Sequence, residues 1–297
     1  MSVATMTKIA SRTPWRRRVA VIAAASALAA AGSLWSGFGP RHALAAAPTQ
    51  AYWTVAGDGG VFTFGGAGYF GSMGGKTLVK PVVGIAPTSD RKGYWLVASD
   101  GGVFAFGDAG YFGSMGGKTL TKPVVGIAAT STGAGYWLVA SDGGIFSFGD
   151  AVFYGSMGGK TLTKPVVGMA AVATGGGYWE VASDGGIFTF GTATFQGSMG
   201  GKTLTKPVVG MASTTDAGGY FEVASDGGIF TFGDAKFQGS MGGKTLVKPM
   251  VGMTATSDAG GYWTVASDGG VFSFGDATFQ GSMGGKMLVS PMVGITA

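Results

Sequence analysis

The chain has no cysteine and a single histidine, His42, among its 297 residues. Without cysteine, no disulfide stabilises the fold and no thiol serves as a nucleophile or metal ligand. Because His42 lies in the N-terminal segment, the rest of the chain also lacks imidazole, a common general base and metal ligand. These absences exclude many hydrolases and metalloenzymes. We therefore predict that the protein is not an enzyme and needs no metal and no cofactor.

Acidic residues are also scarce, and the formal net charge of +5 comes from the N-terminal segment. Residues 1–47 carry six basic side chains and no acidic one, which leaves 14 basic against 15 acidic side chains in the remainder. That remainder lacks the basic surplus typical of nucleic-acid binders. The sequence predicts no nucleic-acid partner and no attraction to anionic lipid.

One apolar run occurs in the chain, from Val19 to about Ala31, directly after Arg16-Arg17-Arg18. Small residues, Ala43-Leu44-Ala45, follow it, as in the cleavage region of an export signal. We predict an export signal over residues 1–45 and a secreted or cell-envelope location. The arginines weakly resemble a twin-arginine signal, and a Sec signal is the alternative. A retained anchor is a third interpretation, but the run is shorter than the ~20 residues of a bilayer span, so we expect no membrane span after signal removal.

A unit of 42 residues is repeated six times, with no slip in the spacing of its tyrosines at Tyr52, Tyr94, Tyr136, Tyr178, Tyr220 and Tyr262. A period of this length predicts a solenoid, an array or a propeller. The repeats and their flanks define one predicted domain, residues 46–297.

Each repeat has the length and turn pattern of a four-stranded propeller blade. In the second copy, strands are predicted at residues 94–99 and 103–106 around Asp100-Gly101-Gly102, a hairpin turn. Further strands are predicted at residues 111–115 and, after Lys122-Pro123, at 124–128. Because both faces of a blade contact other blades, Tyr94 and Leu96 should face one neighbour and Trp95 and Val97 the other.

The two ends of the repeat region complete one unit between them. The chain stops after Met292–Thr296, the strand that should precede the strand of Tyr52 and Trp53. We therefore predict an all-β, six-bladed β-propeller of four-stranded blades, closed by pairing of the C-terminal strand with the N-terminal blade. Closure of this kind leaves no open sheet edge at the two ends.

The segments DGGVFAFGDAGYFGSMGG, KPVVGIA and GYWLVAS resemble the repeats of regulator-of-chromosome-condensation propellers. More specifically, YWLVASDGGIFxFGDAxFxGSMGG is similar to tandem repeats of secreted actinobacterial proteins, most of which have no assigned role. The resemblance covers residues 51–297 and implies a propeller, as does a looser likeness to Kelch and YWTD propellers. It implies no nucleotide-exchange activity in this nearly neutral domain.

Two repeated motifs that suggest ligand sites are better explained as turns. The stretch from Gly71 to Lys76 resembles a phosphate-binding loop, but three residues instead of four separate Gly71 from Gly75 and no helix follows. The aspartates of the first turn in each copy, beginning with Asp58, lack the alternating acids of a calcium loop. Hairpin geometry accounts for them.

Two sets of residues break the repetition and are the candidate site residues. Glu180 and Glu222 occupy the same place in consecutive copies, where two carboxylates could divide acid and base roles in glycan hydrolysis. Gln196, Gln238 and Gln280 replace an aromatic residue after Phe195, Phe237 and Phe279, and an amide beside an aromatic ring suits carbohydrate. The alternatives are solvated strand ends or a ligand-binding contact for the glutamates, and inter-blade packing with outward-facing glutamines for the second set.

From these features we predict a binding protein whose repeated blade surfaces recognise a glycan, a cell-wall polymer or a surface protein. Weak sites repeated around a ring bind more tightly together when one ligand spans several of them. A glycan hydrolase or lyase that uses Glu180 and Glu222 is one alternative, and a structural adhesion scaffold is another.

Overall fold

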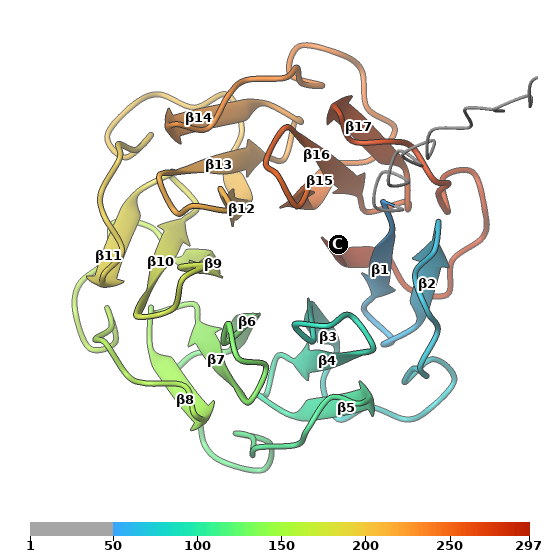
Figure 1. The fold of residues 1–297 in the computed structure, drawn as a ribbon, viewed down its shortest axis with the longest axis vertical. Coiled ribbons are helices and arrows are strands. Elements are labelled where there is room, and N and C mark those ends of the chain that lie inside the picture. Colours follow the sequence, from blue (N-terminus) through green and yellow to red (C-terminus); the bar gives the residue numbers. More distant parts are fainter. Residues whose placement is uncertain (1–49) are drawn as a thin grey trace, which may run out of the picture. The chain divides into compact units, whose positions relative to one another are not determined.

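Six three-stranded antiparallel sheets, one for each repeat, follow one another around a ring in the computed structural model, which describes residues 50–297 (Figure 1). The predicted six-bladed β-propeller is therefore confirmed. Named from the innermost strand outward, the sheets are β18 (Met292–Thr296), β1 (Tyr52–Ala56) and β2 (Val61–Phe64); β3 (Val82–Pro87), β4 (Gly93–Ala98) and β5 (Val103–Gly107); β6 (Val124–Ala129), β7 (Gly135–Ala140) and β8 (Ile145–Gly149); β9 (Val166–Ala171), β10 (Gly177–Ala182) and β11 (Ile187–Gly191); β12 (Val208–Ser213), β13 (Gly219–Ala224) and β14 (Ile229–Gly233); β15 (Met250–Ala255), β16 (Gly261–Ala266) and β17 (Val271–Gly275). We number these blades 1 to 6 in this order.

The six innermost strands lie side by side around the axis of the ring. Each carries a glycine at the point of closest approach, and a Cβ built on Gly126 would lie 3.8 Å from the Cα of Gly168 in the next blade. Larger side chains at this position would push neighbouring inner strands apart. The repeated Val-Gly of each copy therefore fits the crowded centre of a closed ring.

The ring closes by pairing of its last strand with its first. In blade 1, β18 pairs antiparallel with β1, with Trp53 opposite Thr296 and Thr54 opposite Ile295. Gln50 also accepts a hydrogen bond from the backbone N–H of Thr278 at 2.6 Å, across 228 residues of sequence. The predicted closure is confirmed, and it leaves β1 with a partner on both sides.

Each contact between adjacent blades, which we call a seam, is filled by the same aromatic pair. The tryptophan or phenylalanine of one blade packs on the tyrosine of the next, with ring centroids 5.1–6.0 Å apart. Tyr94 and Leu96 pack with blade 1, whereas Trp95 and Val97 pack with blade 3, as predicted from the alternation along the strand. The Trp53 and Tyr52 series is thus core, and buried rings of this size supply much of the apolar area removed from water.

The prediction of a fourth strand in each blade is wrong. Residues 111–115, predicted as a strand, form an irregular outer segment with no ladder to β5. Two of its backbone groups are bonded across the seam instead: the Tyr136 hydroxyl accepts from the Phe112 N–H and donates to the Gly113 carbonyl at 2.6 Å. The Met115 N–H donates to the Gly101 carbonyl of the same blade at 2.9 Å. Gly113 has φ of +129°, which a glycine adopts without strain and which breaks a regular strand.

The predicted export signal, residues 1–45, lies outside the described residues. Within residues 50–297 the structure has strands and turns and no helix long and apolar enough to cross a bilayer.

Candidate functional site

The two glutamates lie inside the molecule, in two different seams. Glu180 is at the centre of β10 and Glu222 at the centre of β13, and each side chain is 0% exposed. Glu180 points into the seam with blade 3, where a Cβ built on Gly143 would meet its Oε2 at 2.8 Å. Glu222 meets Gly185 of blade 4 in the same way. The structure does not bring the two carboxyls together in a cavity, and neither reaches the surface.

Both carboxyls lack a hydrogen-bond partner among residues 50–297. Burial raises the pKa of Glu180 to about 8, with Asp142 raising it further and Lys160 acting in the opposite direction. Burial likewise raises the pKa of Glu222 to about 8, against the attraction of Lys202. A carboxyl without a partner in an apolar interior favours its neutral form, so both groups are protonated at neutral pH.

The three glutamines lie in seams, and the aromatic residues before them lie on the surface. Gln196, Gln238 and Gln280 are half-buried, and a Cβ built on Gly233 would lie 3.1 Å from the Gln196 side chain. Gln196 also donates from Nε2 to the Thr194 hydroxyl at 2.9 Å. In blades 1, 2 and 3 the same place is filled by Phe70, Phe112 and Tyr154.

The preceding position forms a ring of exposed aromatic side chains, one on the outer segment of each blade. These six residues, which we call the aromatic ring, are 56–61% exposed: Tyr69, Tyr111, Phe153, Phe195, Phe237 and Phe279. The outer segments lie at the perimeter of the propeller (Figure 1). Three of these aromatics, Phe195, Phe237 and Phe279, are predicted from the sequence only as neighbours of the glutamines. The signal that would have found them is their presence in all six copies.

The aspartates of the first turn are hairpin residues, as predicted. In each copy the carboxylate accepts the backbone N–H two residues later, as Asp100 does from Gly102 at 3.0 Å. The intervening Gly101 has φ of +76°, and a Cβ there would lie 2.5 Å from the Met115 side chain. Within the part of the chain that the structure describes, no cluster of three acidic side chains is arranged to hold a metal ion.

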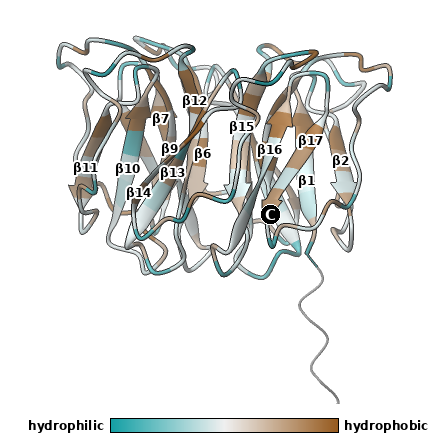
Figure 2. Cartoon of the chain, turned by 90° about the horizontal axis from the view of Figure 1, so that it is seen from above, coloured by the Kyte–Doolittle hydropathy of each residue, from teal (hydrophilic) through white to brown (hydrophobic). Residues whose placement is uncertain are grey.

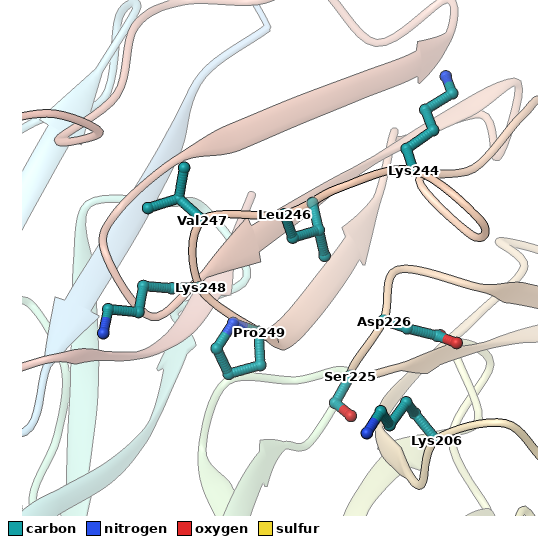
Figure 3. Close-up of a pocket in the computed structure, with 8 residues that line it drawn as sticks. All are labelled: Lys206, Ser225, Asp226, Lys244, Leu246, Val247, Lys248 and Pro249. Atoms are coloured by element: carbon teal, nitrogen blue, oxygen red, sulfur yellow. The ribbon is translucent and has the colours of Figure 1, made fainter.

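The strands run between the two ends of the ring (Figure 2), and the two ends carry different residues. The lysine end, as we name it, carries the hairpin aspartates and the connections between blades: residues 76–81, 118–123, 160–165, 202–207, 244–249 and 286–291. The first hairpin turn and two connections are joined by backbone bonds from Gly57 to Pro291 and from Val82 to Gly57, each 2.9 Å. A cavity of about 330 Å³ lies here, between Lys206, Asp226 and the connection from Lys244 to Pro249 (Figure 3).

The opposite end, which we call the aspartate end, carries the loops after β3, β6, β9, β12 and β15 and the turns after the outer strands. Its centre holds a cavity of about 670 Å³, lined by apolar residues of the inner strands such as Ile127 and Met211 and by hydroxyls such as Ser131. At the same end, pairs of aspartates flank one threonine hydroxyl: Thr214 Oγ1 lies 2.9 Å from a carboxylate oxygen of Asp216 and 3.0 Å from one of Asp234. In a second pair, the Gly260 N–H lowers the pKa of Asp258, whereas desolvation raises the pKa of Asp276.

Comparisons with known proteins bear on the fold. No protein-family model and no curated protein matches the chain. A solved structure described as a nidogen/laminin complex is similar, with a TM-score of 0.60 and 12% sequence identity, over 83% of this chain and 97% of that one. At this identity the likeness shows the propeller fold alone. The likeness to secreted actinobacterial repeats stays a prediction, as does the absence of enzyme activity.

Proposed function

We propose that the protein is a binding protein of the secreted or cell-envelope space, and that the aromatic ring binds a glycan polymer. The observation that carries this is the exposure of one aromatic side chain on every blade, at 56–61% of its surface. The five tryptophans and the six repeat tyrosines of residues 50–297 are, by contrast, buried in the seams. A flat exposed ring covers the apolar C–H face of a sugar, and six of them give a repeating polymer several contacts at once.

Polar groups beside the aromatic ring support the same ligand. Tyr69 and Tyr111 donate to Ser72 and Ser114 at 3.2 and 3.1 Å, so each hydroxyl is held along the outer segment. Gln196, Gln238 and Gln280 place amides next to the exposed phenylalanines in three consecutive blades. An amide donates to and accepts from sugar hydroxyls. Glu180 and Glu222 are not part of this surface because they are buried.

The test is binding of cell-wall polysaccharide and a glycan panel to the full chain and to matched variants. Replacing all six members of the aromatic ring by serine should abolish retention, because each contact is weak and the sum is lost. Replacing only Tyr69, Tyr111 and Phe153 should give an intermediate loss. Because each side chain is partly buried, serine should lower the melting temperature, but the circular dichroism spectrum at the binding temperature should stay that of the folded protein. Retention that is equal in the wild-type and sixfold variants would contradict the proposal.

A protein partner is the second candidate. The similar solved chain comes from a complex of nidogen with laminin, and the apolar cavity at the aspartate end offers a concave surface. The side chains of Gln196, Gln238 and Gln280 can form hydrogen bonds with a glycan or with a protein partner. Capture of one envelope protein that survives loss of the aromatic ring, and that is lost when the exposed cavity residues Ser131 and Thr215 are changed to lysine, would favour this candidate over a glycan.

A further inference from the structure

The net charge of the propeller conceals a strong separation of charge between its two ends. Eleven of the fourteen basic side chains in residues 50–297 lie on the connections at the lysine end, and all eleven are exposed: Lys76, Lys80, Lys118, Lys122, Lys160, Lys164, Lys202, Lys206, Lys244, Lys248 and Lys286. Six hairpin aspartates share this end, so its formal charge is +5. The aspartate end has seven aspartates against Arg91, Lys92 and Lys236, a formal charge of −4.

Apolar side chains project from the lysine end on three connections. Val79, Val247, Met287 and Val289 are 86–99% exposed, the largest exposures among the large hydrophobic residues in the described part of the chain. The other three connections carry Thr121, Thr163 and Thr205 where these have valine, and Met287 stands where the other five copies have threonine. The apolar residues are therefore confined to one side of the ring, and nothing in the repeat requires them.

The three apolar connections are neighbours. Pro249 accepts a hydrogen bond from Ser267, and Ser267 accepts one from Met292, each at 2.9 Å. On the other side of that connection, Pro291 accepts from Gly57, which in turn accepts from Val82. Val247, Val289 and Val79 thus occupy consecutive places around the lysine end. Figure 3 shows how one of them lies, with Val247 between Lys244 and Lys248 on a single connection.

We propose that this face, the three connections 244–249, 286–291 and 76–81 at the lysine end, docks onto an anionic lipid surface. Lysines beside fully exposed apolar residues match both components of such a surface. The ammonium groups attract anionic headgroups, and the apolar tips enter the boundary between headgroups and acyl chains. A hydrophilic polyanion would use the lysines and leave Val79, Met287 and Val289 in water. The sequence analysis predicted no attraction to anionic lipid because the domain has almost no net charge. That prediction does not apply to the lysine end, which by itself has a formal charge of +5.

The orientation of the bound ring follows from the position of the apolar tips. Docking through three adjacent connections directs the aspartate end, with its charge of −4, away from the anionic lipid. The aromatic ring on the outer segments remains in water and available to a second ligand. This inference uses a different surface from the proposed glycan site, so either can fail without the other.

The test is depth-dependent fluorescence quenching by single-cysteine labels on the full chain, because the chain contains no other cysteine. Labels at Val79→Cys and Val289→Cys report the proposed face. A label at Thr163→Cys reports the connection on the opposite side of the lysine end, and one at Ser131→Cys reports the aspartate end. Because each label reports its own surroundings, binding of residues 1–45 to the vesicle does not imitate docking of the ring.

In vesicles with one third phosphatidylglycerol and quencher-labelled acyl chains, we expect quenching at positions 79 and 289, less at 163 and none at 131. The quenching should disappear in pure phosphatidylcholine and at high salt, since the lysines act through screened charge. With the label at 289, the changes V79T, V247T and M287T should raise the lipid concentration needed for half-maximal quenching by about tenfold. These changes install the residue found in the other connections, so folding is preserved.

Three results would overturn the proposal. The first is the absence of quenching at 79 and 289 in anionic vesicles. The second is equal quenching at 131, which would show that the ring has no preferred orientation. The third is protection of position 289 from an aqueous quencher without vesicles, which would show that a second copy or another protein segment covers this face.

Discussion

Two pairs of seams in the ring have the same backbone arrangement but different side chains at their centres. Leu96 and Leu138 occupy the central position of β4 and β7, and Glu180 and Glu222 occupy that position in β10 and β13. All four side chains are 0% exposed. The leucines join apolar clusters with the preceding blade, whereas the glutamates face a backbone turn with no hydrogen-bond partner.

The difference shows that burial here is imposed by the fold and not by the residue. The flanking Tyr, Trp and Val of each copy close the seam whatever lies at its centre, so a glutamate is carried into the interior with its neighbours. The buried glutamate is tolerated in its protonated form, because the free-energy cost of burying a neutral carboxyl is far smaller than that of burying a charged one. Two ionisable groups are therefore held in the form that water disfavours at neutral pH.

The largest expected effect comes from making a leucine seam resemble a glutamate seam. Leu138→Glu removes a side chain packed against Trp95 and Val97 of blade 2 and puts a carboxyl in its place. We expect a loss of about 3–5 kcal/mol in the free energy of unfolding near pH 5, with a further loss as the pH rises through the pKa of the new carboxyl. Thermal unfolding followed by circular dichroism measures both. Leu138→Met is the control, and it should cost about 1 kcal/mol.

The opposite change should stabilise the protein and remove its pH dependence. The pKa of each glutamate is raised from 4.5 to about 8 on folding, so the folded state binds more protons than the unfolded state between these values. The contribution of the two protonated carboxyls to the free energy of unfolding is therefore complete below pH 4.5. This contribution decreases as the pH rises, and it is lost when the pH passes about 8. Glu180→Leu with Glu222→Leu should raise the melting temperature by on the order of 10 °C at pH 9, and by much less at pH 5.

The variant Glu180→Gln with Glu222→Gln separates charge from polarity in the same seams. It keeps an unpartnered polar group but cannot ionise, so its melting temperature should match that of the wild type near pH 5 and exceed it near pH 9. A wild-type melting temperature that stays constant from pH 5 to pH 9 would show that the carboxyls acquire partners or water in solution.

A smaller effect is expected at the seam between blades 5 and 6, where Phe221 replaces tryptophan. In the other five blades the indole N–H donates to the outer segment, as Trp95 does to the Gly110 carbonyl at 2.6 Å. Phe221 cannot donate to the matching carbonyl of Lys236. Phe221→Trp should restore this bond and stabilise the protein by about 1 kcal/mol, a rise of roughly 2–4 °C in the melting temperature. A fall would show that the closer 5.1 Å contact between Phe221 and Tyr262 leaves no room for the larger ring.

Much of the architecture could be predicted from the sequence because the same local pattern occurs six times. The unbroken 42-residue spacing, the Asp-Gly-Gly turns and the split between Met292–Thr296 and Tyr52 were enough to predict the blades and their closure. The alternation in Tyr94–Val97 even gave the face of each side chain. The fourth strand was predicted wrongly because residues 111–115 have strand-like composition, while their hydrogen bonds depend on a tyrosine of the neighbouring blade.

The sequence alone determined the strands, turns, aromatic seams and number of blades, since these follow from local pattern and repetition. Only the tertiary structure decided where the exceptional residues lie. It buried Glu180 and Glu222 in separate seams, exposed the aromatic ring, and gathered lysines and apolar tips at one end of a domain with almost no net charge. The physical reason is that burial and electrostatic potential depend on which residues from distant repeats become neighbours. The composition and local pattern of the chain do not determine those neighbours.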